Sequence, residues 1–442
     1  MRRRKMIAIL CILSFLSLTS CIKTPKKVEH NDQSKQKKII TLYHIQEEAP
    51  IQEIIMDSIK RFEDQYPEFQ VDVTVMSNDA YKHYLKIRSA TKEMPDVFST
   101  WAGGSLKELV NTQFIVNLRD YMMQDQYLDR FMDKAIEMVD YEDGIWAVPV
   151  ENVTLSLVIY NKDIFSKLQL SPPETYEEFL EVIKVLRSQH IIPLALANRT
   201  GWPGSMYYMY FVDRIGGSEV FKNAIERANH YTFEDAAFVE AGYKIQELIA
   251  KNAFPEGFNW LDEDNGDARS LIYNEEAAMI LTGTWFLSKL NGAKPELLEK
   301  LDVFPFPVIE EGRGSKDHYV GSVGDNFYSI ASSCAYPDEA FKLIQFLIDD
   351  TAVQKRIEAG RIPPIKNTSY KEPLFQKIYT MIQNAPYVQF WYDQYLPPRL
   401  GEVHNMLMKE LFDGEEPEII ARKMEHAVRR YYLDNDEILL GR

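Results

Sequence analysis

Residues 39–75 read IITLYHIQEEAPIQEIIMDSIKRFEDQYPEFQVDVTV, and this stretch decides the fold. Its first six residues are rich in β-forming side chains. Pro50 then opens a helical stretch with an apolar residue every three or four positions, namely Ile51, Ile54, Ile55, Ile59 and Phe62. Pro67 ends that helix, and residues 71–75 alternate between apolar and polar as a strand does. The stretch is therefore predicted to be a strand–helix–strand unit, long enough to join two parallel strands.

The same alternation continues along the chain. A helix is predicted over 79–91 and a strand over 96–100. Thr175 and Glu178 form a capping box ahead of an apolar helical face. Further strands are predicted over 155–160, 192–196 and 276–281, and further helices over 235–251, 268–273, 284–290 and 337–349. This is an open α/β pattern, in which ligands bind at the carboxyl ends of the strands.

The N-terminus has the order of a secretion signal: basic residues, an apolar run over 7–18, and small residues before Cys21. The apolar run is too short to cross a bilayer, which takes roughly 20 residues. Residues 18–21, LTSC, resemble a bacterial lipobox, which implies that residues 1–20 are removed and that the Cys21 thiol is lipidated. The alternative is an ordinary signal with a chance cysteine. The polar, lysine-rich segment 21–38 is predicted to be a disordered tether.

Length and charge narrow the functional class. The chain has 442 residues, enough for two or three domains. Loss of the four cations at 2–5 would take the net charge from −16 to −20, which argues against nucleic acid and against a body lying on anionic lipid. The mature chain keeps Cys334 as a single unmodified cysteine, so no cysteine zinc site is expected. The acidic segment 262–267 does not fit the calcium-loop spacing and is interpreted as a solvated loop, so neither metal nor cofactor is predicted.

Four motifs, in order, resemble the family 1 extracellular solute-binding proteins, the sugar-capturing lipoproteins of ABC importers. They are RFEDQYP at 61–67, MPDVF at 94–98, YNKDIF at 160–165 with PETYEEF at 173–179, and AMILTGTW at 278–285. The resemblance runs from about residue 39 to the C-terminus. It implies a type II periplasmic-binding-protein-like fold with a ligand cleft between two lobes.

The resemblance also implies how the chain is divided. Lobe one would hold 39–150 and 308–350, and lobe two 151–307 and 351–442, with hinge crossings at 148–150, at 305–307 and near residue 350. The protein would be a monomer at the outer face of the cell membrane, held there through its lipid anchor alone. It would pass its ligand to the membrane permease subunits of an ABC transporter.

A sugar site needs aromatic rings for the sugar's C–H faces and carboxylates or amides for its hydroxyls. Trp285 occupies the position at which the family stacks a ring on sugar. Trp101 directly follows a predicted strand, Trp202 lies in a predicted loop over 198–204, and Trp391 and Trp260 are further candidates. The alternative for each tryptophan is a place in the core.

The polar candidates are six residues near strand ends or loops: Glu47, Glu151, Asp325, Asn326, Asp393 and His44. The alternatives are solvated surface carboxylates and a structural histidine.

The predicted function is capture of a sugar, expected to be an oligosaccharide, by closure of the two lobes. A sensory partner that presents bound sugar to a membrane receptor would have the same sequence features. An exported glycosidase would need a pair of carboxylates with one raised pKa, which a sequence cannot show. No serine-hydrolase elbow, zinc-protease motif or P-loop is present. An enzyme is therefore not expected.

Overall fold

The computed structural model describes residues 37–91 and 93–440, without the side chains of 325 and 434–440. The predicted signal peptide, Cys21 and all but the last two residues of the predicted tether lie outside this part. The first strand begins at Lys38, one residue before the predicted start of folded structure.

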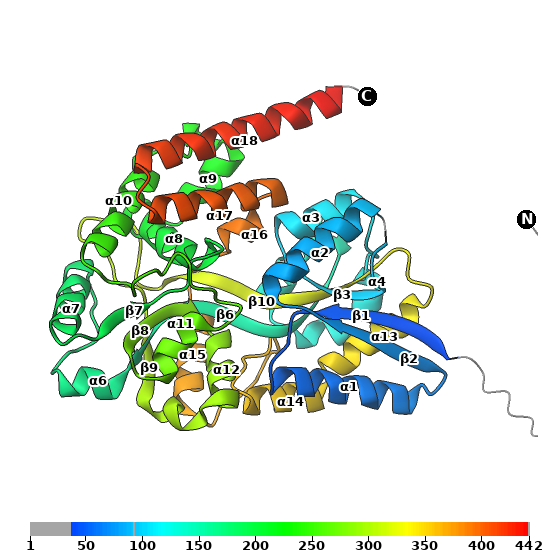
Figure 1. The fold of residues 1–442 in the computed structure, drawn as a ribbon. Helices are drawn as coiled ribbons and strands as arrows, with labels where there is room; N and C mark the ends of the chain where they lie inside the picture. Colours follow the sequence, from blue (N-terminus) through cyan, green and yellow to red (C-terminus); the bar gives the residue numbers. More distant parts are fainter. Residues whose placement is uncertain (1–36, 92, 441–442) are drawn as a thin grey trace, which may run out of the picture. The chain divides into compact units, whose positions relative to one another are not determined.

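Apart from a short two-stranded sheet of β4 Asp140–Tyr141 and β5 Gly144–Ile145, nine of the strands form one mixed sheet that runs through the described chain (Figure 1). Its main path has the order β2-β1-β3-β10-β6-β8-β7, with β9 paired to β6 and β11 paired to β10. β1 is parallel to β2 and β3, and β7 is parallel to β8, whereas β10 and β6 are antiparallel to each other. The strands are β1 Lys38–His44, β2 Phe69–Val75, β3 Val97–Thr100, β6 Val148–Asn161, β7 Ile192–Ala195, β8 Ala277–Gly283, β9 Leu301–Phe304, β10 His318–Ile330 and β11 Tyr387–Gln389.

The first lobe is built on β1, β2 and β3. α2 and α3 lie on one side of these strands, and α1, α13 and α14 lie on the other (Figure 1). The predicted apolar face of α1, including Ile55 and Phe62, is buried. The helices of this lobe are α1 Ile51–Gln65, α2 Asn78–Thr91, α3 Gly104–Asn111, α4 Arg119–Met123, α5 Asp133–Glu137, α13 Pro337–Leu347 and α14 Asp350–Glu358. The predicted strand–helix–strand unit is confirmed.

The second lobe is built on β7, β8 and β9. Thr175 caps α7 with both bonds of the predicted capping box. α16, α17 and α18 lie beside α8 and α10 on one side of the sheet (Figure 1). The helices are α6 Lys162–Lys167, α7 Tyr176–Ser188, α8 Trp202–Gly216, α9 Val220–Glu226, α10 Ala236–Ala250, α11 Asp267–Tyr273, α12 Trp285–Ala293, α15 Pro373–Asn384, α16 Tyr392–Tyr395, α17 Pro398–Phe412 and α18 Pro417–Leu440. None of the helices in the described residues is long and apolar enough to cross a membrane.

Two long strands, β6 and β10, run from one lobe into the other (Figure 1). All 14 residues of β6 are buried, although sequence analysis predicted a strand over 155–160 alone. A strand buried on both faces has no period-two pattern, so its first half was not recognised. The pairing of β10 with β6 shifts register on both sides of Asp325, which marks a bulge. Two lobes joined by shared strands confirm the predicted fold class. The exact lobe boundaries stay a prediction, although α14, which falls in the segment predicted for lobe two, packs against α1 of the first lobe.

Candidate ligand-binding site

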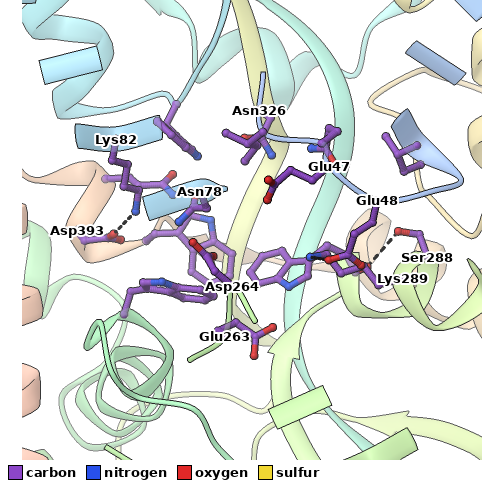
Figure 2. A pocket seen from close by; sticks show the side chains of 18 of the residues that line it. Glu47, Glu48, Asn78, Lys82, Glu263, Asp264, Ser288, Lys289, Asn326 and Asp393 are labelled. Carbon is purple, nitrogen blue, oxygen red and sulfur yellow. Dashed lines mark hydrogen bonds and ion pairs between the residues drawn. The ribbon is translucent and has the colours of Figure 1, made fainter. Parts of the chain in front are cut away.

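A cavity of about 140 Å³ lies where the two lobes meet (Figure 2). The segments after β1, β3 and β8 all contribute to it, as expected for the carboxyl ends of strands in an open α/β sheet. The lining residues are Ile45, Gln46, Glu47, Glu48, Ala49, Ile51, Asn78, Lys82, Trp101, Trp202, Ser205, Met206, Met209, Glu263, Asp264, Trp285, Ser288, Lys289, Asn326, Arg361, Trp391, Asp393 and Gln394.

Four of the five predicted tryptophans line this cavity. The rings of Trp202 and Trp285 are 6.1 Å apart at 66°, and those of Trp285 and Trp391 are 5.8 Å apart at 57°. Trp101 lies at the end of β3 and is 5% exposed. The cavity therefore has indole rings at several angles around one space, which suits apolar ring faces.

Two local features position these rings. A Cβ atom on Gly283 would lie 2.1 Å from Cζ3 of Trp285, so the glycine lets the indole fold back over the end of β8. Trp202 is the first residue of α8, with Pro203 in the first turn, and does not lie in the predicted loop. Because proline is favoured at helix starts as well as in loops, the Trp-Pro-Gly sequence was compatible with a loop and with the first turn of a helix.

Predicted polar residues also reach the cavity. Glu47 comes from the segment after β1, and Asp393 is held by Lys82 Nζ and Asn405 Nδ2, each 3.3 Å from its Oδ2. Asn326 follows the bulge in β10 with a φ of 57°, and its Oδ1 is buried without a hydrogen-bond partner among the described residues. Gln394 Oε1 and Trp202 Nε1 lack partners in the same part of the chain. The cavity thus offers free acceptors and a free donor, which hydroxyl groups can satisfy.

The structure places three predicted residues away from the cavity lining. His44 is fully buried, its Nδ1 accepts a hydrogen bond from the Gln46 N–H, and burial lowers its pKa to about 4. Glu151 is also fully buried and pairs with Arg356 at 3.3 Å. Trp260 is 77% exposed, with Lys409 Nζ 5.6 Å from the centre of its ring.

The physical reasons differ. His44 and Glu151 belong to strands in the interior of the sheet, where neighbours cover both faces. Trp260 lies in a surface loop. The backbone of Asp325 pairs with Asn152 at the bulge, and its side chain lies outside the described part.

Several lining residues were not recognised from the sequence. Glu263 and Asp264 belong to the acidic segment interpreted as a solvated loop, yet the Glu263 side chain is 12% exposed and Asp264 accepts the Asp79 N–H at 3.1 Å. This corrects the solvated-loop interpretation. Lys82 and Lys289 are charges on helices, which are normally solvated, so no sequence signal marked them.

The carboxylates of the cavity repel one another. Burial raises the pKa of Glu263 to about 7, against the opposing effect of Arg269. Burial and the nearby charge of Asp264 also raise the pKa of Glu47. Burial alone would raise the pKa of Glu48, but the positive charges of Lys289 and Arg269 outweigh it, and that pKa is lowered. The cavity is therefore an acidic, aromatic site in which Lys82 pairs with Asp393 and Lys289 pairs with Glu48.

The family model for bacterial extracellular solute-binding proteins matches residues 46–354. The chain belongs to this family. Its members are binding proteins of transporters, not enzymes, and the same holds for this chain.

Three similar proteins illustrate the relationship. A multiple sugar-binding protein of Streptococcus mutans is 25% identical over 360 residues, covering 80% of this chain and 81% of the relative. The melibiose/raffinose/stachyose-binding protein MelE of Bacillus subtilis is 20% identical over 422 residues, covering 94% and 95%. A structure solved in work on xylan utilization by the thermophilic bacterium Caldanaerobius polysaccharolyticus has a TM-score of 0.82 and 26% identity, covering 88% of this chain and all of that one.

Proposed function

We propose that this solute-binding protein captures a sugar, expected to be an oligosaccharide, for an ABC transporter. The observation that carries the proposal is the group of Trp101, Trp202, Trp285 and Trp391 around one cavity, whose buried polar atoms include several without a partner in the described part of the chain. Indole rings suit the C–H faces of a sugar, and the free acceptors suit its hydroxyls. The sugar-binding relatives described above support the same class of ligand.

The volume of the cavity bears on ligand size. A cavity of about 150 Å³ is known to hold benzene, so 140 Å³ has room for about one six-membered ring. Glu47 and Glu48 at the edge are exposed, so the cavity opens toward solvent. We expect one sugar ring to occupy the space among the tryptophans and the rest of the chain to extend through this opening.

The proposed mechanism is closure of the lobes on the ligand. Glu47 and Trp101 come from the first lobe, and Trp202 and Trp285 come from the second. A ligand that contacts both sets at once has more favourable contacts in the closed state, so its binding shifts the population toward that state. The membrane permease then recognises the closed protein.

Location follows from the N-terminal sequence. We propose that Cys21 is lipidated, that the segment up to residue 38 tethers the folded part to the outer face of the cell membrane, and that the protein acts as a monomer. The net negative charge of the folded part would repel it from anionic lipid, so the protein would contact the membrane through its lipid anchor.

A titration of intrinsic tryptophan fluorescence with a panel of mono- and oligosaccharides tests the proposal. Binding among the tryptophans should change the emission and saturate. Calorimetry with the same sugars provides an independent measurement. If the folded protein binds none of them in either assay, the sugar assignment is wrong.

A further inference from the structure

One carboxylate of the first lobe lies between two cations of the second. Glu48 follows β1, whereas Arg269 belongs to α11 and Lys289 to α12. Arg269 Nη2 and Lys289 Nζ lie 3.2 Å and 3.1 Å from Glu48 Oε1. Figure 2 shows Glu48 beside Lys289 at the edge of the cavity. We call these three residues the clasp.

The positive charge of Arg269 is balanced mainly by the Glu48 carboxylate of the clasp. Its side chain is 7% exposed, and its Nη1 has no hydrogen-bond partner among the described residues. Within its own lobe the carboxylate at hand is Glu263, whose Oε1 lies 3.9 Å from Arg269 Nε, beyond hydrogen-bond distance. A buried cation without a close anion is costly, so Arg269 needs one of these two carboxylates.

We infer that Glu48 and Glu263 compete for Arg269, and that the Glu48 partnership stabilises the closed arrangement of the lobes. In the closed arrangement Glu48 makes the hydrogen bond and Glu263 stands back. When the lobes separate, Glu48 leaves with the first lobe, and Arg269 turns to Glu263. Glu48 and Glu263 are therefore positioning residues that set the free-energy difference between the open and closed arrangements. The inference rests on the lobe closure of the proposed function.

Two further observations support the competition. Glu48 is among the charges that raise the pKa of Glu263, after burial as the main cause and with Asp264 acting the same way, while Arg269 and Lys289 oppose them. The two carboxylates thus repel each other when both are near Arg269. Glu48, Glu263 and Lys289 also line the cavity, so a bound ligand would contact both competing carboxylates and one cation of the clasp.

An exposed ion pair between the lobes, separate from the clasp and from the pair of Lys82 and Asp393, offers a matched control. Lys86 of α2 and Glu402 of α17 approach to 2.6 Å, but their side chains are 62% and 56% exposed. Exposed pairs contribute little because water screens them. Glu402→Gln should therefore leave the closed arrangement unchanged.

The test is hydrogen–deuterium exchange of the full chain without sugar, read at peptides that cover Asp79. The Asp79 N–H lies in the first turn of α2, where no helical partner is available, and it donates to the Asp264 carboxylate of the other lobe. It therefore reports closure at a point outside the clasp. Glu48→Gln should raise exchange there by about tenfold, Glu263→Gln should lower it, and Glu402→Gln should not change it.

Opposite effects of Glu48→Gln and Glu263→Gln are the signature of competition. A merely local role for Glu48 would raise exchange around residues 45–50 and leave the Asp79 peptides unchanged, which would overturn the inference. An equal rise in both variants would overturn it as well. Because no sugar is present, failure of the sugar panel would not produce either result.

Discussion

Trp285→Ala is the substitution that tests the site most directly. Trp285 stands between Trp202 and Trp391, with ring centres 6.1 Å and 5.8 Å away. Replacing it removes the central ring of the cluster and the surface on which we expect a sugar to stack. The variant should still fold, because Trp285 is only partly buried at the start of α12.

The size of the effect follows from the contacts. Loss of one stacked ring costs about 1–3 kcal/mol in comparable aromatic contacts. Since 1.4 kcal/mol is a factor of ten, the dissociation constant should rise about 5- to 150-fold. Each lost ring pair, worth about 0.5–1.5 kcal/mol, should also lower the free energy of unfolding, which requires a separate measurement.

Isothermal titration calorimetry with the best ligand of the sugar panel measures the change in affinity. Trp260→Ala is the matched control, because this indole is 77% exposed and lies outside the cavity lining. The control should bind as the wild type does. Unchanged affinity of a folded Trp285→Ala variant would refute the stacking role, and an equal loss in both variants would refute the placement of the site.

Three more predictions concern stability, pH and location. Arg356→Met leaves the fully buried Glu151 without its cation, so the free energy of unfolding in urea should fall by about 3–5 kcal/mol; an unchanged midpoint would contradict this. The pKa of Glu263 is raised to about 7 from an ordinary 4.5. Between these pH values the folded protein keeps the proton that the unfolded chain has released, so the free energy of unfolding of the wild type should fall as the pH rises. Glu263→Gln should therefore be more stable than the wild type at pH 8, by on the order of 3 kcal/mol, and equal to it near pH 4; denaturation at both pH values measures this, and a constant difference would count against it. Cys21→Ser should release the protein from the membrane fraction and leave sugar affinity unchanged, whereas loss of affinity would show that anchor and receptor are not separable.

Local signals in the sequence located some of the helices and strands and missed others, such as α3 and α8. The apolar spacing over 51–62 identified α1, and the capping box at Thr175 located the start of α7. β6 was underestimated because complete burial removes the alternation that identifies a strand. β10 was not predicted at all, since its bulge and Gly324 break the pattern in its middle.

The site was predictable where strand ends point into it. Trp101 follows β3 directly, and Trp285 follows β8 after Gly283, so topology alone brings them to one edge. His44 was assigned because it ends a strand, and Glu151 because it follows a predicted hinge crossing. Both residues belong to strands, β1 and β6, in which neighbouring residues bury their side chains. Lys289 and Glu263 could not be assigned, because their roles depend on a contact between segments far apart in the chain.

The bulge in β10 gives the molecule a mechanical property. β10 and β6 pair with each other and run through both lobes, so a movement of one lobe relative to the other must bend these two strands. A ladder is most compliant where its hydrogen bonds are interrupted, and here that point lies next to Asn326 in the cavity. We therefore expect a ligand that contacts Asn326 to reduce the flexibility of β10 at the bulge, where bending of the two shared strands is easiest.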